Sequence, residues 1–242
     1  MSTSDVGSAE FTDLVGRSRW FLSAVRSGES TEPARRSLAA VDPAALDALE
    51  PSGRLAFWLN TYNAATQDAL RSNPERFENR RTFFSEPVMA VAGTELSLDG
   101  IEHGILRGAQ WKYGLGYVPN PFASAFVRRH RVADLDPRIH FALNCGAAAC
   151  PAIAAYTADT IDEELDRAAE SYLTSETVVE DGTARVPRVM LWYRGDFGGR
   201  SGIRRLLREY GIIEPEASPK VRYREYDWSL ALDAFRDGEC PE

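Results

Sequence analysis

The segment RLAFWLNTYNAATQDALRS, residues 54–72, is the most distinctive helical stretch of the sequence. Apolar side chains recur in it at helical spacing and would share one face of a helix: Leu55, Trp58, Leu59, Tyr62 and Ala65. Polar side chains form a second stripe at positions i, i+3 and i+7: Asn60, Asn63 and Gln67. The segment therefore predicts a helix with one apolar face and one polar stripe.

The two asparagines in one turn of this helix call for an explanation. Asparagine inside a helix costs up to ~0.7 kcal/mol relative to alanine. Asn60 and Asn63 could form a solvated face, or their amides could bond to a neighbouring loop. Alternatively, one amide orients a catalytic imidazole or donates a hydrogen bond to an oxyanion.

Outward from this helix, the chain alternates helices with a few strands. The first 50 residues predict short helices, one of them opened by Asp42-Pro43. Residues 88–108 predict two short strands running into a helix, residues 157–175 an amphipathic helix, and residues 177–193 a hairpin across Asp181-Gly182. A helix stopped by Gly211 and an alternating strand over 220–232 follow. We expect an α+β fold, a mostly helical single domain around a small, mainly antiparallel sheet. Residues 1–50 would be a helical extension packed on a core of residues 51–242.

The composition is that of a globular protein, with 44% hydrophobic and 26% charged residues among 242. The net charge is −8, and only two of the 28 basic residues are lysines. Nucleic-acid binding needs a basic patch, so we expect no nucleic-acid partner. No run approaches the ~18 apolar residues of a membrane span, and the N-terminus carries no secretory pattern. We therefore expect a cytoplasmic protein without a membrane partner, whose three cysteines stay reduced.

The segment SLDGIEHGILRG, residues 97–108, supplies one of the three histidines. If its helix begins near Asp99, His103 lies one turn in, beside Ile101 and Ile105. Glu102 is adjacent in sequence, but neighbouring helical side chains diverge by about 100°. His103 is either a structural residue or a catalytic base.

The segment DPRIHFALNCGAAACPAIAAY, residues 136–156, combines a histidine with two cysteines. Residues 138–145 predict a strand on which His140 faces away from the more apolar side. Cys150 precedes a proline, which would place its thiol at the start of a helix over 151–156. A helix N-terminus stabilises a thiolate, so Cys150 is the preferred nucleophile over Cys145. Backbone N–H groups of residues 147–149 could form an oxyanion hole.

A metal site would use the same side chains. His103, His140, Cys145 and Cys150 are the right types and number for tetrahedral zinc. The spacing His-x4-Cys-x4-Cys matches no common structural zinc pattern, and we expect no metal and no cofactor.

Five motifs in order resemble the domain-of-unknown-function 547 family: AFWLNTYNA (56–64), LSLDGIEHGILRG (96–108), DPRIHFALNCGAAACPAIAAYTA (136–158), LWYRGDFG (191–198) and YDWSL (226–230). The resemblance extends from Leu55 to Leu230. It implies that the recurrent polar positions of the family correspond to Asn60, Tyr62, Asn63, Glu102, His103, His140, Cys145, Cys150 and Pro151. The family name assigns no function.

Three functional interpretations follow from these residues. The first is a cysteine-dependent hydrolase or acyl-transfer enzyme acting on a small molecule or peptide, with Cys150 or Cys145 as nucleophile and His103 as base. In this interpretation Asn60 or Asn63 orients the imidazole, and Glu102 and His140 are further candidates. The second is a non-enzymatic interaction domain with a buried polar network. The third is a His/Cys metal-binding domain.

Overall fold

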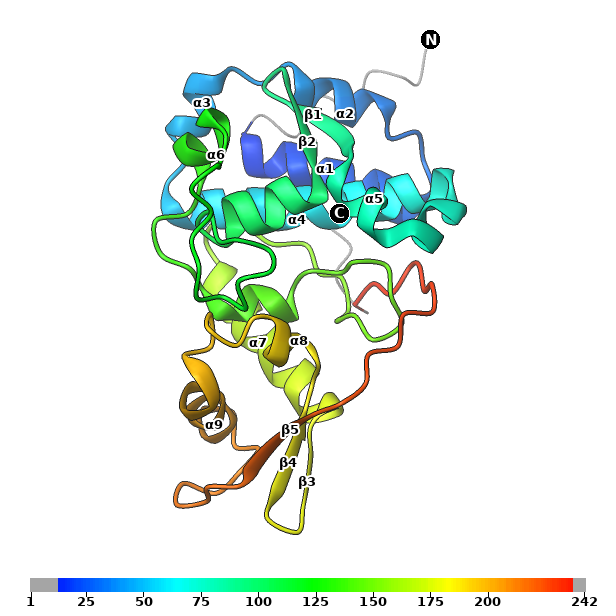
Figure 1. Ribbon diagram of the computed structural model, residues 1–242. Coiled ribbons are helices and arrows are strands. Elements are labelled where there is room, and N and C mark those ends of the chain that lie inside the picture. Colours follow the sequence, from blue (N-terminus) through cyan, green and yellow to red (C-terminus); the bar gives the residue numbers. More distant parts are fainter. Residues whose placement is uncertain (1–12, 237–242) are drawn as a thin grey trace.

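The computed structural model describes residues 13–236, with α1–α5 and one hairpin in the upper part of Figure 1 and α7–α9 with three strands in the lower part. The α-helices are α1 (Leu14–Ser27), α2 (Glu32–Ala39), α3 (Pro43–Asp47), α4 (Pro51–Ser72), α5 (Arg80–Ser85), α6 (Ala125–His130), α7 (Ile161–Glu176), α8 (Val189–Trp192) and α9 (Gly199–Glu209). Two 3-10 helices, η1 (Pro74–Asn79) and η3 (Pro137–Phe141), and a π-helix, η2 (Gly100–Leu106), accompany them. The strands are β1 (Pro87–Val91), β2 (Thr94–Ser97), β3 (Val178–Glu180), β4 (Thr183–Val186) and β5 (Lys220–Tyr223). The fold is α+β and mostly helical, as predicted.

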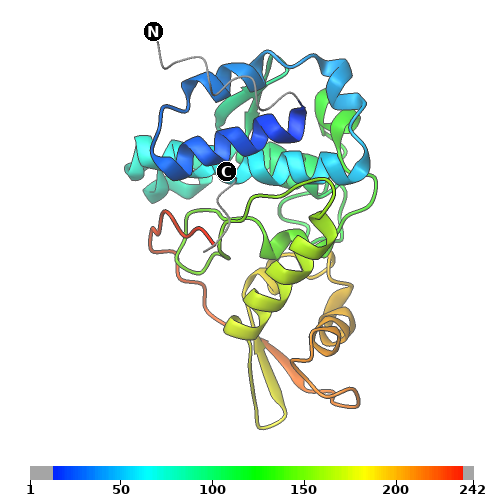
Figure 2. The ribbon, with the colours of Figure 1, turned by 180° about the vertical axis from the view of Figure 1, so that it is seen from behind.

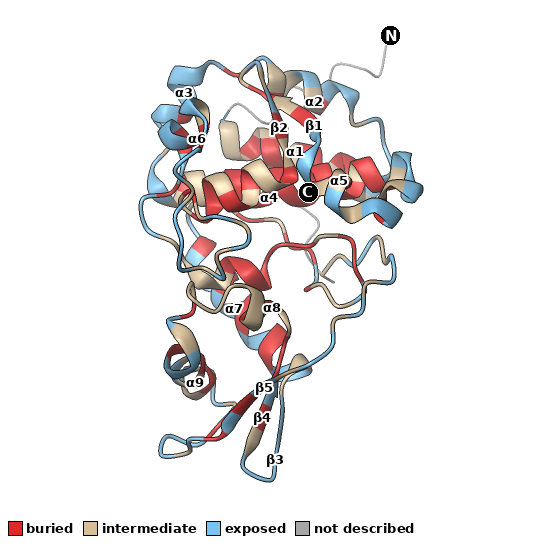
Figure 3. Cartoon of the chain, viewed as in Figure 1, coloured by how far each residue is buried: buried red, intermediate tan, exposed pale blue. Residues whose placement is uncertain are grey.

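Helix α4 lies at the centre of the larger hydrophobic cluster and packs along α1 (Figure 3). It begins at Pro51, slightly before the predicted start, because proline fits the first turn of a helix, where its missing N–H is not needed. Every residue from Ala56 to Gln67 is buried, so both the apolar face and the polar stripe are covered. The polar stripe is therefore not a solvated face.

The strands form two small sheets rather than one. Strands β1 and β2 pair antiparallel, and so do β3 and β4 across the predicted turn at Asp181-Gly182, where both residues have positive φ. Strand β5 adds to β4 in parallel. The strand predicted over 220–232 ends at Tyr223. The chain beyond it bonds through isolated bridges at Leu230 and Phe235.

The strand predicted over residues 138–145 is wrong. Pro137–Phe141 is the 3-10 helix η3, opened by the Asp136 side chain, which accepts a hydrogen bond from the N–H of Arg138. Residues 139–144 are all buried, so no solvent-facing side alternates with a buried one. The predicted helix over 151–156 is also absent, and these residues have no regular structure apart from an isolated bridge at Ile153.

A second hydrophobic cluster fills the space between α7, α9 and the three-stranded sheet. Figure 2 shows α7 from the opposite side, below α1 and α4. Phe141 of η3 belongs to this cluster, whereas its neighbours Ile139 and Ala142 belong to the larger one. The segment around η3 thus joins the two clusters. No helix within residues 13–236 has the length and apolar character to cross a membrane.

Candidate functional site

A cavity of about 400 Å³ lies beside η3, between residues of the two hydrophobic clusters. Its walls come from α4, η2, the loop after η2, residues 140–145, α8 and the C-terminal segment. Four of the predicted site residues line it: Glu102, His103, His140 and Cys145. Segments far apart in the sequence therefore meet at one cavity.

Glu102 accepts hydrogen bonds from two tyrosine hydroxyls. The Tyr193 hydroxyl donates to its Oε1 at 2.6 Å and the Tyr62 hydroxyl to its Oε2 at 3.1 Å. Burial opposes the ionised form, but the hydrogen bond from Tyr193 and the charge of Arg107 act in the opposite direction, and the pKa of Glu102 is lowered. Burial and the Glu102 carboxylate raise the pKa of both tyrosines, so both remain protonated donors.

The tautomer of His103 follows from its contact with Arg107. The Nη1 of Arg107 lies 3.0 Å from the Nδ1 of His103, and a guanidinium can only donate. Nδ1 therefore accepts, and its 3.6 Å separation from the Glu102 Oε1 is not a hydrogen bond. The neutral ring carries its proton on Nε2, which lies 3.4 Å from the Asp99 Oδ1. His103 thus presents a donor N–H, not the lone pair of the predicted base.

His140 is held by a buried carboxylate. Its Nε2 lies 2.8 Å from the Asp196 Oδ2, and the ring stacks on Tyr193 with centroids 4.0 Å apart. Asp196 also binds Arg107 through two hydrogen bonds, at 2.7 and 3.0 Å. Burial raises the pKa of Asp196, but the bonds from His140 and Arg107 outweigh it and lower the pKa to about 2. Asp196 is therefore an anion that fixes the Nε2–H tautomer of His140.

The Nδ1 of His140 then carries the ring's lone pair. Burial lowers the pKa of His140, so the ring is neutral near pH 7 although Asp196 opposes the shift. Nδ1 makes no hydrogen bond to any residue within 13–236. A neutral imidazole with one nitrogen fixed by a carboxylate and the other available is the arrangement of a general base.

The two thiols are in direct contact. The Sγ atoms of Cys145 and Cys150 are 3.0 Å apart, and both cysteines are free. The Cys150 Sγ also accepts the backbone N–H of Cys145 at 3.1 Å and lies 3.2 Å from the Tyr226 hydroxyl. The Cys150 thiolate and burial raise the pKa of Cys145, whereas these donors overcome burial and lower the pKa of Cys150. Cys240 lies outside the described residues.

The stabilisation of Cys150 has a different cause from the predicted one. No helix follows Cys150, so the helix N-terminus expected to favour its thiolate does not exist. Hydrogen bonds from Cys145 and Tyr226 replace it. The N–H groups of Ala148 and Ala149, predicted to face an oxyanion, donate instead to the carbonyls of Ser229 and Asp227.

The amides of α4 bond the backbone rather than an imidazole. Asn60 accepts the N–H of Tyr156 at 2.8 Å and donates to the same residue's carbonyl at 2.9 Å. Asn63 accepts the N–H of Asn144 at 2.9 Å and donates to the carbonyl of Ala142 at 3.0 Å. Neither asparagine lines the cavity, and neither contacts an imidazole, so their contacts do not provide the predicted orienting role.

A comparison with protein families matches residues 46–173 to the family described as protein of unknown function, DUF547. That range is more than half of the chain. The chain belongs to the DUF547 family. A search of curated proteins and a search of solved structures each gave no significant match. The motifs LWYRGDFG and YDWSL lie beyond residue 173, outside the matched range.

Four residues of this DUF547 site were not singled out from the sequence, one of which, Arg107, lies in the motif of residues 96–108. Tyr193 and Asp196 lie in LWYRGDFG, and Tyr226 opens YDWSL. Both motifs were noted, but nothing in their local pattern connects them with His140 or the thiols. Among residues 13–236, no group of three or more His, Cys, Asp or Glu side chains has an arrangement suited to a metal ion.

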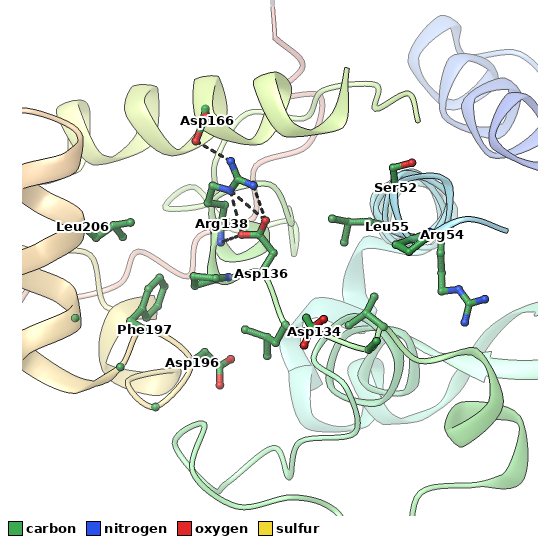
Figure 4. Close-up of a pocket in the computed structure, with 18 of the residues that line it drawn as sticks. Ser52, Arg54, Leu55, Asp134, Asp136, Arg138, Asp166, Asp196, Phe197 and Leu206 are labelled. Carbon is green, nitrogen blue, oxygen red and sulfur yellow. Dashed lines mark hydrogen bonds and ion pairs between the residues drawn. The ribbon is translucent and has the colours of Figure 1, made fainter. Parts of the chain in front are cut away.

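A second, larger cavity of about 950 Å³ in the DUF547 chain has Asp196 in its wall (Figure 4). Neither a cysteine nor a histidine lines it. Figure 4 shows Arg138 turned toward Asp136 and Asp166, to which it bonds at 2.7 and 2.8 Å. Because Arg138 is already bound by these carboxylates and neither a thiol nor an imidazole is at hand, the smaller cavity is the better candidate for chemistry.

Proposed function

We propose that the 400 Å³ cavity is the active site of a thiol-dependent hydrolase or acyl-transfer enzyme. One observation carries the proposal. The cavity wall brings together Cys145, in contact with the Cys150 sulfur, and His140, whose imidazole is fixed by Asp196. Two-step acyl transfer requires a nucleophile with a proton acceptor, here Cys145 with Cys150. It also requires a base that a carboxylate orients, here His140 with Asp196.

Cys145 is the nucleophile in this proposal because it lines the cavity and Cys150 does not. Its sulfur attacks the acyl carbon while its proton passes to the Cys150 sulfur, 3.0 Å away. The carbonyl oxygen gains the negative charge, and the Nε2–H of His103 donates to it, leaving its long contact with Asp99. When the intermediate collapses, the leaving group departs with the proton held by Cys150.

Release of the acyl group uses His140. Its Nδ1 takes a proton from water, or from an acceptor alcohol or amine, and the resulting oxygen or nitrogen attacks the thioester on Cys145. Asp196 stabilises the imidazolium that forms. The tetrahedral intermediate then collapses, the Cys145 sulfur leaves, and the proton returns from His140.

The substrate's acyl group would be apolar. Exposed hydrophobic side chains concentrate in the loop after η2: Trp111, Tyr113, Leu115, Tyr117, Val118 and Phe122. Tyr113 and Leu115 of this loop also line the cavity, together with Trp192 and Trp228. An acyl chain or aromatic ring would bury its surface there, at about 25 cal/mol per Å².

A panel of p-nitrophenyl esters and acyl thioesters of increasing chain length tests the proposal. We expect turnover that rises with acyl length, and intact mass spectrometry should detect one acyl group on Cys145 during turnover. His140→Asn should lower kcat by about 10²–10⁴-fold, because it removes the general base.

Cys240→Ser is the matched control and should leave both turnover and acylation unchanged, whereas Cys145→Ser should abolish both. Turnover that survives in Cys145→Ser, or no acyl adduct on the wild-type chain with any ester or thioester, would contradict the proposal.

The interaction-domain alternative is favoured by one observation. The buried Asn60 and Asn63 amides bond backbone groups, and Asn60 also bonds the Ser18 hydroxyl at 3.2 Å, as a structural role requires. In that case the cavity would bind an apolar ligand without changing it. Ligand-induced quenching of tryptophan fluorescence that is equal in wild type and Cys145→Ser, with no turnover in either, would support this alternative.

A further inference from the structure

The thiols of Cys145, which lines the cavity, and Cys150, which lies behind it, form a preorganised pair. The loop between them, residues 146–149, is held at both ends and in the middle. Ala148 and Ala149 donate to the C-terminal segment, and the Tyr172 hydroxyl donates to the carbonyl of Ala149 at 2.7 Å. Gly146, at φ +90°, makes the sharp turn after Cys145. The sulfurs are therefore kept in contact by the fold rather than by chance approach of a flexible loop.

The pair is also chemically asymmetric. Cys150 accepts the Cys145 backbone N–H, and the Tyr226 hydroxyl lies 3.2 Å from its sulfur against 3.5 Å from that of Cys145, so negative charge is better stabilised on Cys150. Cys145 holds the proton and faces the cavity. The thiolate is the attacking species in disulfide exchange, so Cys145 attacks as its proton passes to the Cys150 sulfur, 3.0 Å away, and Cys150 can then resolve the mixed disulfide.

We infer that Cys145 and Cys150 are a redox-active dithiol that exchanges with low-molecular-weight disulfides entering the cavity. The inference depends on the proposed function only in taking Cys145 as the attacking sulfur. An aromatic-walled cavity of this size fits a small disulfide rather than a folded protein partner.

The exchange proceeds in two balanced steps. The Cys145 sulfur attacks one sulfur of the disulfide RSSR, its proton passes to Cys150, and RS⁻ leaves, which gives the mixed disulfide Cys145–S–S–R. Cys150 then gives its proton to RS⁻ and attacks the Cys145 sulfur, and the second RS⁻ leaves. The cysteine pair loses two electrons, and RSSR gains them to become RSH and RS⁻.

Oxidation would also remove the nucleophile of the proposed acyl transfer. The disulfide form has no Cys145 thiol, so the hydrolase would be inactive until a dithiol reductant restores the pair. The substrate disulfide and the acyl compound would compete for the same cavity.

Oxidised glutathione is the probe, with the full chain carrying Cys240→Ser to remove the third thiol. Titration with glutathione redox buffers followed by acid quenching and mass spectrometry should show a reversible, two-electron conversion to a Cys145–Cys150 disulfide. Cys150→Ser in this background should accumulate one glutathione adduct on Cys145, because the resolving sulfur is missing. Cys145→Ser should accumulate none.

The inference would be overturned if the pair remained a dithiol in excess oxidised glutathione, or if the adduct formed on Cys150 in Cys145→Ser and not on Cys145 in Cys150→Ser. Circular dichroism spectra of both variants show whether they fold. Glutathione exchange is measured without any ester, so an inactive hydrolase leaves this result intact, and a failed exchange leaves acyl transfer open.

Discussion

Single residues of the site fall into two groups according to where their hydrogen bonds end. Asn63 bonds main-chain groups, Asn60 bonds main-chain groups and the Ser18 hydroxyl, and both amides are fully buried. His103 and His140 each have one ring nitrogen fixed by a charged partner and the other nitrogen left for the cavity or a weaker contact. The first group holds the backbone that follows η3, at Ala142 and Tyr156, whereas the second group faces charged side chains, so mutations in the two groups should have different effects.

Asn63→Ala should destabilise the fold by about 1–3 kcal/mol. It leaves the N–H of Asn144 and the carbonyl of Ala142 buried without their partner, and each unsatisfied group carries a desolvation penalty. Urea unfolding followed by circular dichroism measures the change. Asn73→Ala, at the exposed end of α4, is the matched control and should change stability by less than about 0.5 kcal/mol. Equal stability of Asn63→Ala and Asn73→Ala would show that the amide does not support the fold.

At the scale of elements, predictability depends on whether local chemistry alone fixes the backbone. The β3–β4 hairpin was predictable because Asp181-Gly182 tolerates the positive φ that its turn needs. Helix α4 was predictable because its period extends over many residues. The structure of residues 138–145 was not predictable, because a short apolar run that is buried on all sides has no distinguishing period. A capping contact of Asp136 favours the 3-10 helix that forms there. The pairing of His140 with Asp196 depends on residues 56 positions apart, which no local pattern reveals.

Two glycines, Gly116 and Gly195, allow the loop after η2 to pack against the turn that carries Asp196. The N–H of Gly195 donates to the carbonyl of Leu115 at 2.7 Å. A Cβ on Gly116 would overlap the Oδ1 and backbone nitrogen of Asp196, and a Cβ on Gly195 would overlap the carbonyl of Gly116. Close main-chain packing that only glycine permits therefore holds the loop against the turn of Gly195 and Asp196.

Gly116→Ala should consequently destabilise the protein more than Gly93→Ala. Both glycines have positive φ, +81° and +70°, so both variants incur backbone strain. Only at Gly116 does the added methyl group meet other atoms, because nothing lies within 4 Å of a Cβ at Gly93. We expect an additional loss of at least ~1 kcal/mol in urea unfolding and faster chymotrypsin cleavage in residues 111–118. Identical unfolding curves for the two variants would contradict this packing.

At the scale of the whole molecule, the C-terminal segment connects both hydrophobic clusters to the thiol loop. It leaves β5 in the lower part of Figure 1 and runs up to α4. Tyr226 packs against both clusters, and the Asp233 N–H donates to Gln67 of α4. Residues 227–236 also exchange main-chain hydrogen bonds with residues 146–153. The position of the thiols is therefore set by a segment about 80 residues away in sequence.

A chain ending at Arg224 should lose both stability and the asymmetry of the thiols. The truncation removes the main-chain partners of Ala148 and Ala149 and the Tyr226 hydroxyl beside Cys150. Without that hydroxyl the Cys150 thiolate is less stabilised, so its pKa should rise toward that of an ordinary thiol. We expect a lower melting temperature and slower iodoacetamide alkylation of Cys150 near neutral pH, measured by peptide mass spectrometry.

A chain ending at Arg236 keeps these contacts and also lacks Cys240, so it should behave as the full chain does. If the chain ending at Arg224 melted and alkylated like the chain ending at Arg236, the C-terminal segment would not position the thiols. If truncation unfolds the chain, Tyr226→Phe isolates the hydroxyl, and it should slow the alkylation of Cys150 while the fold is retained.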